Sequence, residues 1–148
     1  MDAENEDAYA FFGAYTFIRE FATLENIDVD QSARKIEKGL KRIVETYENE
    51  NYEQMGVLVS TVGLGMGMLL TELAKKFTEK YTSFEKTPEI YAKKVKLLNQ
   101  SLALSNFITA TALSFAEKIS QSREYAKTFG ETMKQLYSSS EVLKSYRE

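Results

Sequence analysis

Two long stretches without a charged residue limit how this chain can fold. They cover 18 residues at positions 54–71 and 20 residues at positions 97–116. A helix that is apolar on all sides must be buried against other helices or lie in lipid. Each glycine in a helix interior costs up to about 1 kcal/mol relative to alanine, so glycines there imply a gain from close packing. The first stretch holds four of them: Gly56, Gly63, Gly65 and Gly67.

Small residues recur at helical spacing in both stretches. Such rows allow two helices to approach each other closely. They therefore predict a central Gly-rich helix hairpin, in which leucine at Gly63 or Gly67 would overpack the contact while Gly39, among charged residues, would tolerate it. The residues predicted to form the contact are Gly56, Ser60, Gly63, Gly67, Ser101, Ser105 and Ala112.

Glycines in an apolar stretch can also indicate a phosphate-binding loop or a membrane span. A phosphate-binding loop is excluded, because "GLGMGMLL" has neither the dinucleotide spacing nor the lysine and hydroxyl of a Walker loop. A membrane-associated hairpin of residues 54–71 and 97–116 stays open, since both stretches reach the length of a membrane span. Asn99, Gln100 and Asn106 make the second stretch polar for lipid. We therefore favour burial within a protein over burial in a membrane.

Periodic patterns predict helices along the rest of the chain. Apolar residues recur every three or four positions over residues 8–24, 29–47 and 125–136. The uncharged stretches extend into helices over residues 52–81 and from Pro88 onward, because proline suits the first helical position. We predict an all-α fold: an antiparallel helical bundle of four to six helices around the central Gly-rich hairpin, with residues 1–148 forming a single domain.

The ends of these helices are predicted from capping residues. Asp28 with Gln31, and Ser138 with Glu141, have the spacing of a capping box, the second of which would open a short terminal helix. Thr87 would cap the helix that starts at Pro88, after a loop over residues 82–86. A break is expected at residues 120–122, where serines interrupt the pattern.

The composition excludes several kinds of chemistry. The chain has neither histidine nor cysteine, which rules out histidine triads, zinc sites and thiol chemistry. The pairs Glu45 with Glu48 and Glu50 with Glu53 have a metal-binding spacing, but no aspartate follows Asp30 to complete a second pair. We assign no catalytic, cofactor-binding or metal-ligating residue, and expect a non-catalytic protein.

Aromatic residues surround the first predicted helix on nearly every side. Phe11, Phe12 and Tyr15 are the candidate interface residues, because exposed aromatic patches mark contacts with partners. The alternative is a helix buried between layers of the fold. We expect a role in assembly or protein interaction through self-association, with a homodimer as the commonest symmetric solution and another protein as a further partner.

Charge is distributed unevenly along the chain. Residues 1–54 hold 13 acidic and 6 basic side chains, whereas residues 55–148 hold 9 and 13. A sequence pI of about 5.2 argues against general nucleic-acid binding. A role as a small helical subunit of a nucleoprotein complex is kept as an alternative. The absence of cysteine and the acidic start favour a cytoplasmic protein, and the Lys and Glu content suits a thermophilic, archaeal source.

Overall fold

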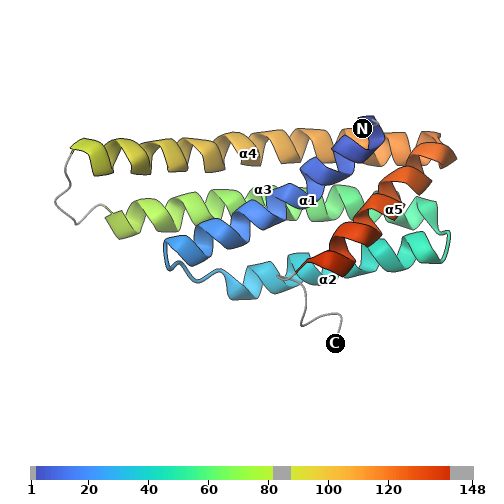
Figure 1. Ribbon diagram of the computed structural model, residues 1–148, viewed down its shortest axis with the longest axis horizontal. Helices are drawn as coiled ribbons and strands as arrows, with labels where there is room; N and C mark the ends of the chain where they lie inside the picture. The colour runs from blue at the N-terminus through green and yellow to red at the C-terminus, as the bar shows by residue number, and fades with distance from the viewer. Residues whose placement is uncertain (1–2, 82–87, 141–148) are drawn as a thin grey trace.

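A computed structural model of the chain describes residues 3–81 and 88–140. In this part of the chain it contains five α-helices and no strand, which confirms the predicted all-α class (Figure 1). The helices are α1 (Ala3–Leu24), α2 (Asp30–Glu48), α3 (Tyr52–Tyr81), α4 (Pro88–Gln121) and α5 (Arg123–Ser139).

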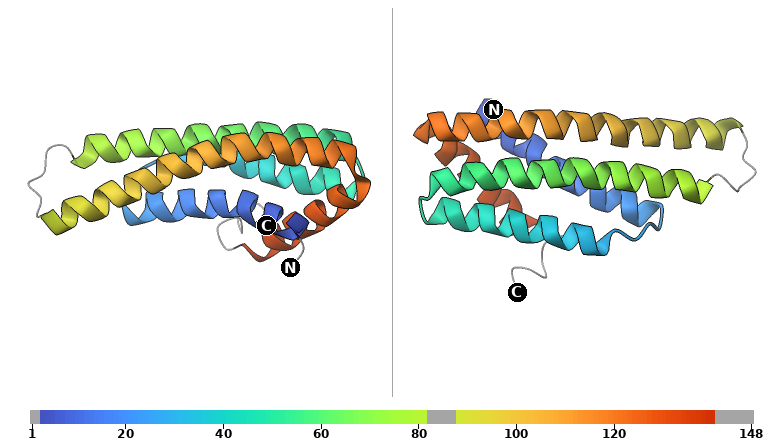
Figure 2. Two further views of the ribbon diagram at one scale, coloured as in Figure 1. Left: turned by 90° about the horizontal axis from the view of Figure 1, so that it is seen from above. Right: turned by 180° about the vertical axis from the view of Figure 1, so that it is seen from behind.

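The helices form two layers. Seen from behind, α4, α3 and α2 lie side by side, and no other helix crosses in front of them (Figure 2). Helices α1 and α5 cross the opposite side of this layer (Figure 1). The most extensive contact between two helices is that of α3 with α4, and α3 also contacts α2 and α1. Helix α3 therefore has neighbours on three sides.

One hydrophobic core lies between the two layers. One apolar row of α3 is fully or almost fully buried in it, as is the periodic row of α2, where Ala33, Leu40 and Ile43 have no exposed surface. Charged residues occupy the rest of the α2 surface, so its amphipathic pattern was sufficient to orient the helix. The buried α3 row consists of Met55, Val59, Val62, Met66, Leu69 and Leu73.

Helix ends follow the sequence in part. The break between α4 and α5 is confirmed at Ser122, whose side chain accepts a hydrogen bond from the backbone N–H of Tyr125 at 3.1 Å. The capping box at Asp28 is wrong: Val29 is the N-cap of α2, and no side chain caps that helix. The Val29 carbonyl already accepts the first helical hydrogen bond, from Ala33, so Asp28 lies outside the helix and accepts from Asp30 N–H instead.

Two further predictions fall at the edge of the described residues. Helix α4 begins at Pro88 as predicted, while Thr87 and the loop at 82–86 lie outside the described residues. Ser138 belongs to the last turn of α5, so it does not start a new helix. The predicted terminal helix from Glu141 onward lies outside the described residues.

Small residues bring α3 and α4 into contact. A Cβ atom added at Gly63 would collide with the Cβ of Ala112, and one added at Gly67 would collide with the hydroxyl of Thr109. The hydroxyls of two buried serines on α4 donate hydrogen bonds to the α3 backbone: Ser101 to the Leu70 carbonyl at 3.0 Å and Ser105 to the Gly67 carbonyl at 2.7 Å. The helices thus pack close enough for side chains of one to bond the backbone of the other.

Three other small residues have different neighbours: Gly56 and Ser60 of the predicted contact, and Gly39 of α2. A Cβ at Gly56 would lie 3.4 Å from the Ala116 carbonyl of α4, an ordinary contact, and the Ser60 hydroxyl donates to the Val57 carbonyl of its own helix. The expectation for Gly39 is wrong. A Cβ there would collide with Val62 of α3, because the side of α2 that carries Gly39 packs on α3.

Alanine substitutions at glycine test this packing. Gly63→Ala should lower the free energy of unfolding by about 1 to 3 kcal/mol, because Ala112 has no rotatable side chain that could move away. Gly67→Ala should cost less, since Thr109 can change rotamer. Gly13→Ala, with no atom within 4 Å of the added methyl, should gain about 0.5 to 1 kcal/mol. Urea unfolding measures all three, and equal changes at Gly63 and Gly13 would contradict the packing argument.

Candidate functional site

The three predicted interface aromatics lie inside the fold. Phe11, Phe12 and Tyr15 are at most 6% exposed in the single chain. The ring of Phe11 meets that of Phe129 on α5 edge to face, with 5.9 Å between centroids, and the Tyr15 hydroxyl donates to the carboxylate of Glu37 on α2. Because α1 contacts α5 as well as α3 and α4, its aromatics pack on several neighbours at once. These three residues therefore belong to the core, and they offer no exposed patch.

Two buried carboxylates connect helices. Glu37 of α2 accepts from Tyr15 and lies 4.0 Å from the guanidinium of Arg19, so it joins α2 to α1. Glu25, after α1, forms an ion pair of 2.6 Å with Lys94 on α4. Each buried charge has an opposite charge and a hydrogen bond, as burial requires. Sequence patterns did not reveal either pair, because the partners are 22 and 69 residues apart.

The outer surface of the α3–α4 pair carries two exposed rows without charge. The row on α3 recurs at spacings of 4, 3 and 4, and the row on α4 at 4, 4 and 3, so each follows one side of its helix. We call these two rows the outer face. It consists of Val57, Thr61, Leu64 and Met68 on α3, with Leu102, Asn106, Ala110 and Leu113 on α4.

Both rows lie on the same side of the molecule. Around α3, the contact residues Gly63 and Gly67 separate the core row from the outer row, and on α4 Ser105 and Ala112 do the same. The rows therefore flank the α3–α4 contact on the side away from the core, which is the uncovered side in Figure 2. Five of their side chains are large, apolar and at least 40% exposed: Val57, Leu64, Met68, Leu102 and Leu113.

Charged residues border the outer face. On α2, next to α3 in the same layer, the exposed residues include Arg34, Lys35, Lys38, Lys41 and Arg42. In the part of the chain that the structure describes, one helix is long and apolar enough to cross a membrane. It covers Tyr52–Lys80; its most apolar 18-residue window has a mean hydropathy of 1.7, and 56% of that window is buried in the fold. Much of its apolar character therefore serves the core.

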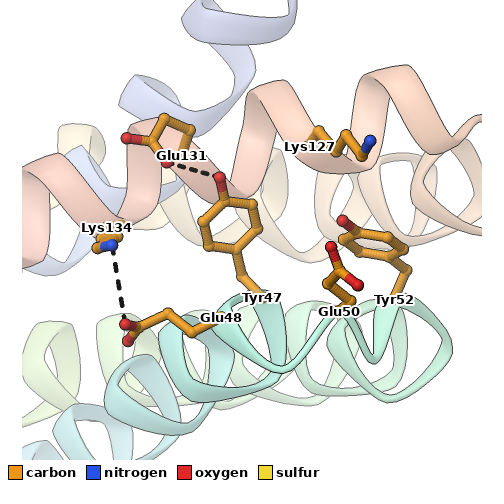
Figure 3. A pocket seen from close by; sticks show the side chains of 7 residues that line it. All are labelled: Tyr47, Glu48, Glu50, Tyr52, Lys127, Glu131 and Lys134. Atoms are coloured by element: carbon orange, nitrogen blue, oxygen red, sulfur yellow. Dashed lines mark hydrogen bonds and ion pairs between the residues drawn. The ribbon is translucent and has the colours of Figure 1, made fainter.

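A second candidate site is a cavity between the α2–α3 turn and α5 (Figure 3). Its volume is about 310 Å³. Gly130 allows the ring of Tyr47 to lie directly against α5, since a Cβ there would collide with that ring. We call it the Tyr47 cavity. The residues that line it are Tyr47, Glu48, Glu50, Tyr52, Lys127, Glu131 and Lys134.

Hydrogen bonding fixes part of the cavity wall. The Tyr47 hydroxyl donates to Glu131 at 2.5 Å, and Lys134 lies 3.7 Å from Glu48. The hydrogen bond to Glu131, together with burial and the negative charge of that carboxylate, raises the pKa of Tyr47 to about 12. Tyr47 is therefore a neutral donor at physiological pH. Among the described residues, no group of three acidic side chains lies close enough to hold a metal ion, so the glutamate pairs of this turn form no such site there.

The raised pKa of Tyr47 predicts a change in stability at alkaline pH. The phenol of an unfolded chain ionises near pH 10. The bond to Glu131 is thus fully present below about pH 10, and its contribution is lost as the pH rises through about 12. The difference in free energy of unfolding between wild type and Tyr47→Phe should shrink over this interval. A difference that stays constant from pH 9 to 12, measured by urea unfolding, would show that Tyr47 has an ordinary pKa (about 10).

Comparisons of the chain with models of known protein families, with curated proteins and with solved structures found no match. A function for this chain is therefore inferred from its own residues, at the outer face and the Tyr47 cavity.

Proposed function

We propose that this protein is a non-catalytic assembly protein that forms a homodimer through the outer face of α3 and α4. In this proposal the α3–α4 pair, held together by its small residues, is the rigid centre of the fold and presents the interface. The single observation that carries it is the lack of any charge on an exposed surface with five large apolar side chains. Solvent-exposed helix positions accept charged residues readily, so packing within the chain does not account for this composition.

The size of the face fits the centre of a dimer interface. Each row spans about twelve helical residues, or about 18 Å, and two helices side by side are about 20 Å wide. The projected area is on the order of 350 Å², and the accessible area of a ridged surface is larger, which makes up a large part of the roughly 800 Å² that each partner buries in a standard interface. An apolar centre with a few polar groups is typical of such contacts. Thr61 and Asn106 would supply those polar groups.

A second copy fits this surface better than lipid does. Asn106 lies within the face, and the cationic surface of α2 lies in the same layer, so the helices could not enter a hydrocarbon core without burying polar groups. A two-fold axis through the face would place the same patch of each chain against the other. The absence of histidine and cysteine from the sequence favours a role that needs no chemistry.

Charges placed in the face test the proposal. The wild type should sediment as a dimer at micromolar concentration, and the double variant Leu64→Glu with Leu113→Glu should sediment as a monomer, because two buried and unpaired carboxylates per chain would oppose the contact. Leu24→Glu is the matched control, since Leu24 is 80% exposed at the end of α1 and outside the face. It should leave the dimer intact.

Three results would refute the homodimer. A wild type that remains monomeric at about 100 µM would exclude it, because a stable homodimer binds more tightly than that. A double variant that still dimerises would move the interface elsewhere. Recovery of the wild type only in the membrane fraction, when it is expressed without detergent, would show that lipid covers the face. Thermal melts of both variants confirm that they are folded.

A further inference from the structure

Two charged side chains of the Tyr47 cavity have no partner in the part of the chain that the structure describes. Lys134 pairs with Glu48, and Glu131 accepts from Tyr47. The side chains of Lys127 and Glu50 form neither a hydrogen bond nor an ion pair with any residue that the structure describes. Figure 3 shows Lys127 on the α5 side of the cavity and Glu50 on the side of the α2–α3 turn. The cavity thus offers an ammonium group and a carboxylate on opposite walls.

Glu50 occupies a position that favours glycine. Its φ is 58°, in the left-handed region, and it follows the C-cap of α2. The Asn51 N–H bonds the Thr46 carbonyl at 2.8 Å, and the Glu50 N–H bonds the Tyr47 carbonyl at 3.0 Å, which is the Schellman pattern. This backbone conformation is unfavourable for glutamate, whereas glycine adopts it readily and asparagine tolerates it.

The other left-handed residue provides a comparison. After α1, the same pattern of bonds surrounds Asn26, with a φ of 52°. Asparagine is among the residues that suit this conformation. Glutamate at position 50 lacks the suitability of asparagine for this conformation, and its side chain lines the cavity. Use of the carboxylate by a ligand would account for a glutamate at this place.

The balance of charges indicates the kind of ligand. Three carboxylates and two ammonium groups line the cavity, so its net charge is −1. A ligand with one carboxylate and two cationic groups would match both the separate charges and the sum. The rings of Tyr47 and Tyr52 can pack against an aliphatic chain or a cation. The Arg123 guanidinium already lies over the Tyr52 ring, 5.8 Å from its centroid. A volume of about 310 Å³ suits a small molecule.

We propose that the Tyr47 cavity binds a free basic amino acid. Lys127 receives the α-carboxylate, Glu50 receives the α-ammonium group, and Glu131 receives the cationic end of the side chain. The aliphatic part of the ligand lies against the two tyrosine rings. This site is separate from the outer face, so it does not depend on dimer formation.

Matched ligands test each contact in the full-length chain. L-lysine is compared by calorimetric titration with cadaverine, which lacks the carboxylate, and with norleucine, which lacks the side-chain ammonium group. The wild type should bind lysine about fivefold more tightly than either, the effect of one exposed ion pair. Lys127→Gln should remove the preference for lysine over cadaverine and leave cadaverine binding unchanged. Lys41→Gln, on the exposed side of α2, is the control and should change nothing.

Glu50→Gly separates binding from folding. Glycine suits the left-handed position, so the melting temperature should rise by about 3 °C. Affinity for lysine and for cadaverine should fall about fivefold, because neither ligand can then pair with the Glu50 carboxylate. If Glu50 had a purely structural role, Glu50→Gly would raise the melting temperature and leave the affinity unchanged. That result, a lysine preference that survives Lys127→Gln, or no saturable binding at about 10 mM lysine would overturn the proposal.

Discussion

At Gly63 and Gly67 the α3 backbone lies so close to α4 that Ser105 donates a hydrogen bond to a carbonyl of α3. Small residues make this approach possible, but they bury little apolar surface themselves. The apolar surface of the core therefore comes from the adjacent row of α3, whose large side chains pack on α1 and α2. Helices α1 and α5 cover the core side of the α2–α3–α4 layer, and nothing in the described chain covers the other side.

The contact also determines what the outer face can be. Once the small residues face the partner helix and the Met and Leu row faces the core, the remaining sides of α3 and α4 point outward. On α2 the corresponding side carries lysines and arginines, as a surface exposed to water usually does. The exposed sides of α3 and α4 carry no charge over residues 54–71 and 97–116. The proposed contact with a second copy would account for this difference, whereas the internal packing does not.

The sequence was sufficient to predict those features that depend on a local pattern. Helix positions, the buried row of α3 and the break at Ser122 follow from periodicity and capping residues that lie close together in the chain. Contacts between distant residues were not predictable. The charged neighbours of Gly39 gave no sign that its own side packs on Val62, and the aromatics of α1 gave no sign that α5 would cover Phe11. Tyr47 and Glu131, which define the cavity, are 84 residues apart.

Glycine has the same physical role at both candidate sites, and Glu50 is the exception that makes the cavity distinctive. Gly63 admits α4 to α3, and Gly130 admits the ring of Tyr47 to α5, so in each case a missing side chain creates the contact. At the end of α2 the local backbone favours glycine as well, yet the chain has a charged residue there that faces a cavity. A local rule that is broken without any gain in packing is typical of a functional position. The exposed apolar rows of the outer face break a rule in the same sense, since they cost solubility and contribute nothing to the core.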